Sequence, residues 1–252
     1  MRPAGVPGPS GHRLWRGWLA IALLAAAAVS SADEFAVKRG SLVETLRSER
    51  RSLGPPWSRS EFDPRVLRAI GNVPRHEFVD PKLAPIAYED RPLPIGHGQT
   101  ISQPLVVALM SEELRLEKGS RVLEVGTGSG YQAAVLAELG AFVYTVETIG
   151  ELADSARRRL TRLGYPNVHV RTGDGYRGWP EASPFDAIIV TAAAPEVPGP
   201  LLTQLRTGGR MVIPVGAQSE PQQLRLITKR SGGLLETTDL LPVAFVPLIR
   251  PH

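Results

Sequence analysis

The residues best suited to binding a ligand form one short segment. Its members are Glu124, Val125, Gly126, Thr127, Gly128, Ser129 and Gly130. Glycine lacks a Cβ, so the backbone can turn sharply at three positions of this segment and approach a ligand closely. The two hydroxyls between the glycines and the carboxylate ahead of them add polar contacts. Such a segment between a strand and a helix is typical of a nucleotide-like ligand bound at the strand end.

The spacing of the glycines separates two classes of cofactor. The dinucleotide fingerprint G-x-G-x-x-G needs a third glycine at position 131 or 133, where this chain has Tyr131 and Ala133. A carboxylate at Glu124 suits a cationic ligand, since it can serve the ammonium group of a methionine moiety directly or through water. It would repel a pyrophosphate. We therefore expect S-adenosylmethionine rather than NAD, with a nucleotide-binding oxidoreductase as the alternative.

Two further acidic residues follow later strands of the expected sheet. Glu147 comes 17 residues after Gly130. A carboxylate at this strand end can accept hydrogen bonds from both ribose hydroxyls, although an acid that caps the next helix is the alternative. The segment 172–175 follows the third strand and can place Asp174, beside Gly175, at an adenine amino group. On its own this tetrapeptide is as typical of a turn as of a site.

Composition excludes several other kinds of site. The chain has no cysteine, which removes disulfides, thiolate nucleophiles and Cys-ligated zinc. Its five histidines are widely scattered, so we expect no metal site. The formal charge is +4, but three of the 29 Lys and Arg residues precede residue 33, and the rest is close to neutral. A nucleic-acid-binding domain is expected to show a clustered basic surface, so we expect no nucleic-acid partner.

The elements that must position these residues alternate between strand and helix. Apolar runs predict strands at 121–125, 142–146, 168–171, 185–190 and 211–215, and helices at 104–116, 131–139, 149–163 and 201–205. Short connections between them imply parallel strands. Near the end, Gln223–Lys229 and Val243–Ile249 flank Ser231–Gly233 and predict an antiparallel pair at the sheet edge. The expected fold is α/β, with a doubly wound, mostly parallel sheet.

The part before residue 104 has a different composition. Helices are predicted at 34–52 and from the Asp63-Pro64 cap to Pro74. Residues 81–103 are rich in proline and glycine and predict a long ordered loop, a kind that is usually functional. We expect one domain over 33–252, with N-terminal helices and a substrate or lid loop (33–103) ahead of a cofactor-binding core (104–252).

Residues 1–32 have the pattern of a targeting segment. Arg13 and Arg16 precede an apolar run over 18–29, and Ser30–Ala32 offers small residues for cleavage. The run is too short to span a bilayer, so we expect no stable membrane insertion after processing. A functional signal implies a periplasmic or secreted protein. The alternative is a misassigned start. The protein would then begin near Val37 and remain in the cytoplasm, where S-adenosylmethionine is made.

Several blocks of the chain resemble the protein-L-isoaspartate O-methyltransferase family. Leu93–Pro104 is similar to a segment peculiar to that family, and Val73–Val79 is similar to its N-terminal part. The remaining similar blocks are Glu124–Tyr131, Gly173–Gly175, Phe185–Ala194 and Gly208–Gly216. They occur in the family order, and residues 1–32 lie outside them. The resemblance implies a Rossmann-like class I methyltransferase fold of seven strands with S-adenosylmethionine as the cofactor.

The resemblance also implies the reaction. Family members transfer a methyl group to the α-carboxylate of L-isoaspartyl residues in damaged proteins and peptides, which initiates repair. Ser102 corresponds to the family's active-site serine and would hydrogen-bond the acceptor carboxylate, whereas the local alternative is a helix cap ahead of Pro104. The implied substrate-binding residues are Gln99, Thr100, Ile101, Pro214 and Val215.

Other functions remain open from the sequence alone. The same fold would serve a small-molecule carboxyl or O-methyltransferase, or a secreted nucleotide-binding module without catalytic activity. We expect a monomer whose partners are isoaspartyl-containing proteins and peptides.

Overall fold

The computed structural model describes Met1 and residues 34–54, 60–217 and 219–250. The chain divides into two units, Met1–Ser41 and Leu42–His252. Apart from Met1, the segment 1–32 lies outside the described residues, so its targeting role and the boundary after it remain predictions. Residues 34–52 are helical, as predicted. Among the described helices, none has the length and apolar character needed to cross a membrane.

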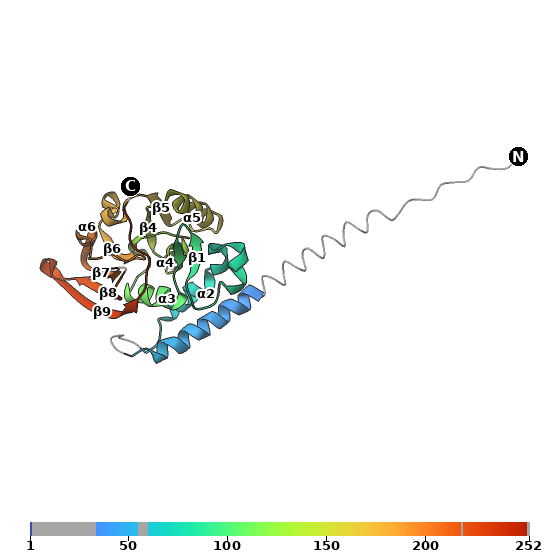
Figure 1. Cartoon of the computed structure of the whole chain (residues 1–252), viewed down its shortest axis with the longest axis horizontal. Coiled ribbons are helices and arrows are strands. Elements are labelled where there is room, and N and C mark those ends of the chain that lie inside the picture. The colour runs from blue at the N-terminus through green and yellow to red at the C-terminus, as the bar shows by residue number, and fades with distance from the viewer. Residues whose placement is uncertain (2–33, 55–59, 218, 251–252) are drawn as a thin grey trace. The chain divides into compact units, whose positions relative to one another are not determined.

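Seven strands form one sheet in the order β5-β4-β3-β6-β7-β8-β9 (Figure 1). Their bounds are β3 Arg121–Val125, β4 Phe142–Glu147, β5 Val168–Thr172, β6 Phe185–Val190, β7 Leu205–Val215, β8 Gln222–Lys229 and β9 Leu235–Val243. Pairing is parallel from β5 to β7 and antiparallel from β7 to β9. The chain runs outward from β3 to β5 and then returns to β6 on the other side of β3. Ligands bind at such a reversal of strand order, and the predicted doubly wound fold is confirmed.

The main helices are α2 Pro64–Asn72, α3 Pro104–Glu113, α4 Tyr131–Glu138, α5 Gly150–Arg162 and α6 Gly199–Gln204. The predicted start of α2 is confirmed, because the Asp63 side chain accepts a hydrogen bond from the backbone N–H of Arg65. Gly140 and Gly164 follow α4 and α5 with φ of 86° and 80°, the left-handed conformation that ends a helix. Right-handed crossovers place α4 and α5 on one face of the sheet and α6 on the other.

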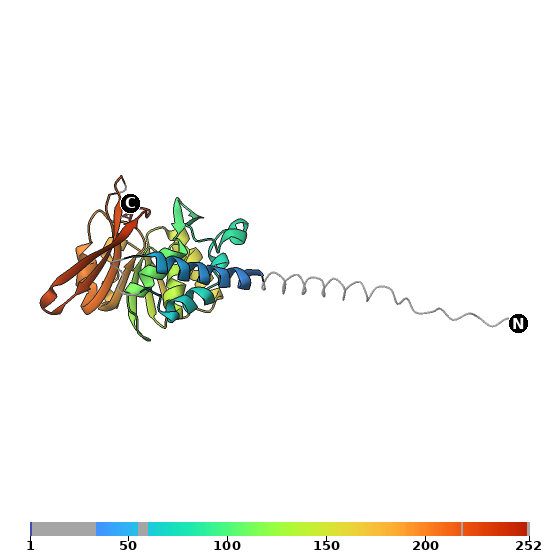
Figure 2. The same ribbon diagram turned by 90° about the horizontal axis from the view of Figure 1, so that it is seen from below.

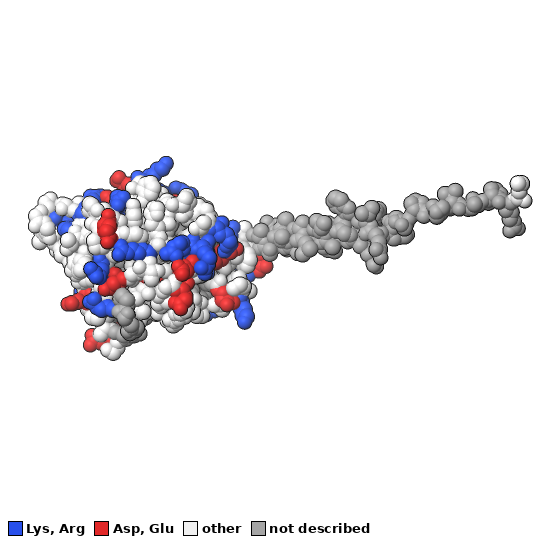
Figure 3. All heavy atoms as spheres, turned by 90° about the horizontal axis from the view of Figure 1, so that it is seen from above, with Lys and Arg blue, Asp and Glu red and all other residues white. Residues whose placement is uncertain are grey.

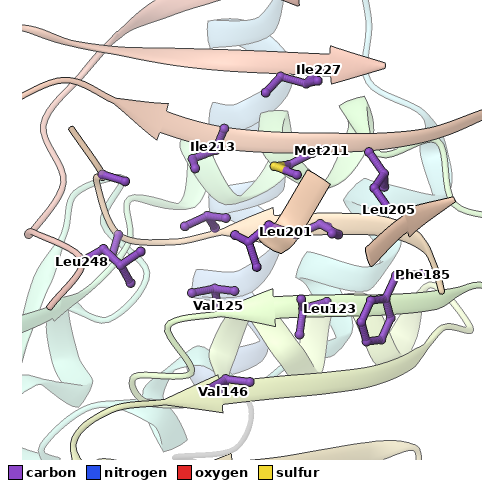
Figure 4. Close-up of a cluster of buried hydrophobic side chains, with 14 of the residues drawn as sticks. Leu123, Val125, Val146, Phe185, Leu201, Leu205, Met211, Ile213, Ile227 and Leu248 are labelled. Carbon is purple, nitrogen blue, oxygen red and sulfur yellow. The ribbon is translucent and has the colours of Figure 1, made fainter. Parts of the chain in front are cut away.

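A cluster of buried side chains fills the space between β3, β6, β7 and α6 (Figure 4). Leu123, Ile213 and Leu201 are fully buried in it. The cluster also restricts the loop after β5, since a Cβ added to Gly175 would lie 2.7 Å from Val125 Cγ1. This packing brings the carboxyl ends of β3 and β5 together.

On the surface shown in Figure 3, Lys and Arg lie among Asp and Glu. Exposed ion pairs of that kind contribute little to stability.

Two predicted elements are wrong in detail. Residues 81–103 are ordered but contain structure of their own: the 3₁₀ helix η2, Pro81–Ile86, and a hairpin of β1, Leu93–Gly96, with β2, Gln99–Ile101. The last strand is β9, whereas Val243–Ile249 was expected there. A turn with positive φ at Gly232 and Gly233 lets β9 start directly after β8, at the edge seen from below in Figure 2.

The last strand was predicted wrongly because the edge of the sheet that it forms is exposed. Most of β9 is exposed, so polar residues such as Thr237 and Asp239 can form it. The apolar run that was mistaken for the strand is used elsewhere. Pro247 forms a parallel bridge with Ala193, and Leu248 is buried in the core cluster beyond β6.

Candidate functional site

A cavity that is partly open to solvent lies where β3, β4 and β6 end. Most of the predicted site residues line it. These are Gln99, Thr100, Ile101, Ser102, Gly126, Thr127, Gly128, Ser129, Glu147 and Gly175. Residues from the hairpin, the glycine segment and two further strand ends therefore meet in one place.

The glycine segment can adopt its shape only with glycine at key positions. Gly126 has a φ of +97°, and a Cβ there would lie 2.5 Å from the Thr191 hydroxyl oxygen. That oxygen lies 2.6 Å from the Gly126 carbonyl oxygen, to which it donates. The N–H of Gly126 donates to the carbonyl of Val146 at 2.8 Å. The turn is thus fixed by β4 on one side and by the end of β6 on the other.

Glu147 is placed as predicted, at the end of β4 and in the cavity wall. One carboxylate oxygen accepts from the N–H of Gly128 at 2.8 Å, and the other accepts from the N–H of Ile149 at 3.0 Å. A carboxylate can accept about four hydrogen bonds, so acceptor capacity remains for two ligand hydroxyls. Among the described residues that line the cavity, Glu147 is the only acidic or basic one. The wall therefore offers no cation to a pyrophosphate.

Glu124 has a different environment from Glu147. Its side chain is fully buried beneath the cavity and does not line it. Burial raises the pKa of Glu124 to about 8, although a hydrogen bond with the Thr145 side chain opposes the shift. The electrostatic preference for a cationic ligand comes instead from Glu147, and ammonium binding by Glu124 remains only a prediction.

Ser102 lies half-buried between β2 and α3 and faces the cavity. It does not cap α3: the residue at the cap position is Gln103, and the carboxylate of Asp90 accepts the hydrogen bond from the N–H of Leu105 at 2.8 Å. Within the described part of the chain, the Ser102 hydroxyl has no hydrogen-bond partner. It is therefore available to a ligand.

Four predicted residues besides Glu124 lie outside the cavity wall. Gly130 precedes α4 in the left-handed conformation, and Asp174 caps a 3₁₀ turn by accepting from the N–H of Tyr176. Pro214 and Val215 end β7, where Val215 is buried and bridges to Ala194. Their roles toward adenine and peptide remain predictions.

The C-terminal segment of the wall, Val246–Ile249, was not predicted from the sequence. Leu248 donates its N–H to the carbonyl of Ala193 at 2.7 Å and accepts from the Tyr176 hydroxyl at 3.1 Å. Thr191 and Tyr131 were also missed as lining residues. The apolar run near the C-terminus was visible in the sequence. Its use as a wall rather than a strand was not, because that depends on contacts with β6.

Tyr131 also links the N-terminal part of the domain to the glycine segment. Its buried ring lies 4.8 Å from the Arg75 guanidinium carbon and packs edge-on against Phe78. Burial raises the pKa of the Tyr131 hydroxyl to about 12. The residue that breaks the dinucleotide fingerprint is therefore a packing anchor at the start of α4.

Comparison with known proteins agrees with this geometry. A sequence model of the family described as protein-L-isoaspartate(D-aspartate) O-methyltransferase matches residues 58–251. A protein-L-isoaspartate O-methyltransferase of Syntrophobacter fumaroxidans is 52% identical over 93% of this chain and 95% of its own length. Another, from Gloeobacter violaceus, is 59% identical over 73% of this chain and 90% of its own.

Solved structures give the same result. A chain described as a protein-L-isoaspartate O-methyltransferase superposes with a TM-score of 0.73 at 34% identity, covering 83% of this chain and 65% of that one. A Plasmodium falciparum chain of the same description, in complex with S-adenosyl-L-homocysteine, has a TM-score of 0.67 at 29% identity. The match covers 83% of this chain and 97% of that one.

Proposed function

Since this chain belongs to the protein-L-isoaspartate O-methyltransferase family, we propose that its cavity binds S-adenosylmethionine and holds an isoaspartyl residue beside it. The chain transfers the methyl group to the α-carboxylate of L-isoaspartyl residues in damaged proteins and peptides and so initiates their repair. One observation carries the proposal: the unpartnered hydroxyl of Ser102 lines the same cavity as the glycine segment and Glu147.

The cavity wall fits the cofactor in shape and charge. Gly126 and Gly175 fit this wall only as glycine, because an added Cβ would lie 2.5 Å from the Thr191 hydroxyl oxygen and 2.7 Å from Val125 Cγ1, respectively. Glu147 has acceptor capacity for the ribose hydroxyls. When bound, S-adenosylmethionine supplies a methyl group activated by the positive sulfonium. The same wall lacks a basic residue for the phosphates of NAD.

The acceptor requires alignment rather than activation. Carboxylic acids have unperturbed pKa values near 4, so the acceptor is ionised at neutral pH and no general base is needed. The wall agrees with this, because its single acidic residue, Glu147, already accepts two backbone hydrogen bonds. Ser102 donates to one acceptor oxygen and leaves the other directed at the methyl group. Alignment of this kind can supply about 7–11 kcal/mol in favourable intramolecular reactions.

The test compares two peptides of the same sequence, one with L-isoaspartate and one with normal aspartate. With labelled S-adenosylmethionine, the purified chain should methylate the isoaspartyl peptide and leave its partner almost unlabelled. Equal labelling of both peptides would favour a general carboxyl methyltransferase. Labelling of neither, together with labelling of a small carboxylic acid, would overturn the repair function.

Two further parts of the proposal concern the state of the protein. We propose that residues 1–32 are removed on export and that the mature chain is a monomer without stable membrane insertion. Mass spectrometry of the mature N-terminus, combined with cell fractionation and light scattering, tests this. An intact N-terminus in the cytoplasmic fraction, or a dimer in solution, would contradict the respective part.

A further inference from the structure

The segment that carries Ser102 does not belong to the main sheet. β1 and β2 form a separate two-stranded sheet, and Ser102 directly follows β2. Strand pairing with β3–β7 therefore does not fix the distance between the serine and the glycine segment. Contacts made by side chains around the start of α3 must do so.

Asp90 makes two of these contacts. One carboxylate oxygen accepts from the N–H of Leu105 at 2.8 Å, and the other accepts from the side-chain amide of Gln103 at 2.9 Å. Both partners lie within three residues of Ser102. On the other side of the serine, Ile101 is buried and pairs with Leu93 across the hairpin. Contacts on both sides of Ser102 therefore fix its position in the chain. Those on its C-terminal side are made by Asp90.

Asp90 is itself fixed by a buried arginine. Arg75 is fully buried and donates to the carbonyl of Ala87 at 2.8 Å and to that of Arg91 at 3.3 Å. These two carbonyls flank Asp90 in the sequence. Burial lowers the pKa of the Arg75 guanidinium, and the nearby charge of Asp90 opposes that shift. The arginine therefore orders the backbone on both sides of the aspartate and attracts its charge.

We propose that Asp90 is a positioning residue for methyl transfer, which holds Ser102 at the acceptor side of the cavity through Gln103 and Leu105. The inference rests on the proposed function. Asp90 lies outside the cavity wall, and its proposed role in positioning Ser102 is distinct from its stabilisation of α3. A displacement of about 1 Å in a catalytic group can reduce the rate by about 100-fold, so loss of the hold should reduce turnover more than folding.

The chain offers a matched control in Asp63. Its carboxylate accepts from the N–H of Arg65 at 2.8 Å and caps α2, just as Asp90 caps α3. Asp63 is remote from the cofactor cavity, which it does not line. Asp63→Ala and Asp90→Ala each remove an aspartate that caps a helix. Only the second removes a contact with the segment that follows Ser102.

The experiment measures steady-state kinetics and melting temperature for the full chain and both variants. Each variant should lower the melting temperature by about 2–4 °C, the loss expected for one cap in a domain of this size. Asp90→Ala should also lower kcat/KM for the isoaspartyl peptide by about threefold to tenfold, up to the loss expected when the Ser102 hydroxyl itself is removed. Its KM for S-adenosylmethionine should change less than about twofold, because the glycine segment and Glu147 are untouched. Asp63→Ala should keep wild-type kinetics.

Two outcomes would overturn the proposal: wild-type kcat/KM in Asp90→Ala, or an equal loss of activity in Asp63→Ala. If Asp90→Ala does not fold, Asp90→Asn replaces it, since the amide keeps an acceptor for Leu105 but presents N–H groups to Gln103. A loss of about threefold or more at an unchanged melting temperature supports the proposal, and unchanged activity overturns it. An inactive wild-type chain would instead contradict the proposed function.

Discussion

The two sides of the cavity are held by different means. On the cofactor side, the glycine segment is fixed by backbone hydrogen bonds, such as that from Gly126 to Val146, and by the buried acid Glu147. On the acceptor side, Ser102 lies between a separate hairpin and α3, and a carboxylate from another loop, Asp90, holds it. Changes on the first side should alter cofactor binding and folding, whereas changes on the second should alter turnover more than cofactor binding.

The largest expected effect is on the pH dependence of stability and concerns Glu124, which is buried on the cofactor side. Burial raises the pKa of Glu124 from 4.5 to about 8, so the folded chain binds a proton that the unfolded chain releases between these values. The stability linked to this proton is fully present below pH 4.5 and is lost as the pH rises through about 8. Glu124→Gln stays neutral and should escape this loss. A shift of this size corresponds to at most about 5 kcal/mol.

The measurement is the free energy of unfolding of both chains from pH 5 to pH 9. The advantage of Glu124→Gln over wild type should grow with pH and level off above about 8. Glu151→Gln, at an exposed position in α5, is the control and should follow the wild-type curve. A constant difference across the range would mean that Glu124 is already ionised in the folded chain.

The second-largest expected effect concerns the turn at Gly126, which forms part of the cavity wall on the cofactor side. Gly126→Ala places a Cβ within 2.5 Å of the Thr191 hydroxyl oxygen and forces a side chain into a φ of +97°. A left-handed conformation costs about 1–2 kcal/mol, and the clash adds to it, so affinity for S-adenosylhomocysteine should fall by about 100-fold or more. Calorimetric titration measures this loss. Gly199→Ala, where a Cβ has nothing within 4 Å, should bind like the wild type.

A somewhat smaller loss is expected at the strand-end acid. Glu147→Gln removes the charge that strengthens hydrogen bonds to ribose hydroxyls and opposes one backbone N–H with an amide N–H group. Charge-assisted hydrogen bonds contribute about 1.5–3 kcal/mol, so the dissociation constant for S-adenosylhomocysteine should rise about 10–100-fold. The same titration gives the value. An unchanged dissociation constant would mean that the ribose does not bind at the end of β4.

The contrast between the two sides also explains what the sequence could and could not predict. The strand ends, the glycine turn and Glu147 depend on residue type and short spacing, and the structure places Glu147, Gly126 and Gly128 in the cavity wall. Periodicity does not tell which face of a buried strand Glu124 occupies, and its role toward the cofactor remains a prediction. Asp90 and the wall segment Val246–Ile249 went unrecognised because their roles arise from contacts that folding creates. Ser102 was identified through family resemblance, not through local chemistry.

The smallest expected effect isolates the acceptor side. The Ser102 hydroxyl has no hydrogen-bond partner in the described part of the chain, so Ser102→Ala should leave the melting temperature unchanged. Loss of a hydrogen bond to the charged acceptor should lower kcat/KM for the isoaspartyl peptide about tenfold, with S-adenosylhomocysteine affinity within about twofold of wild type. Ser120→Ala, beside β3 but at its opposite end, is the control for removing a serine hydroxyl. A tenfold loss of cofactor affinity in Ser102→Ala would mean that the two sides are coupled, and the distinction between them would not hold.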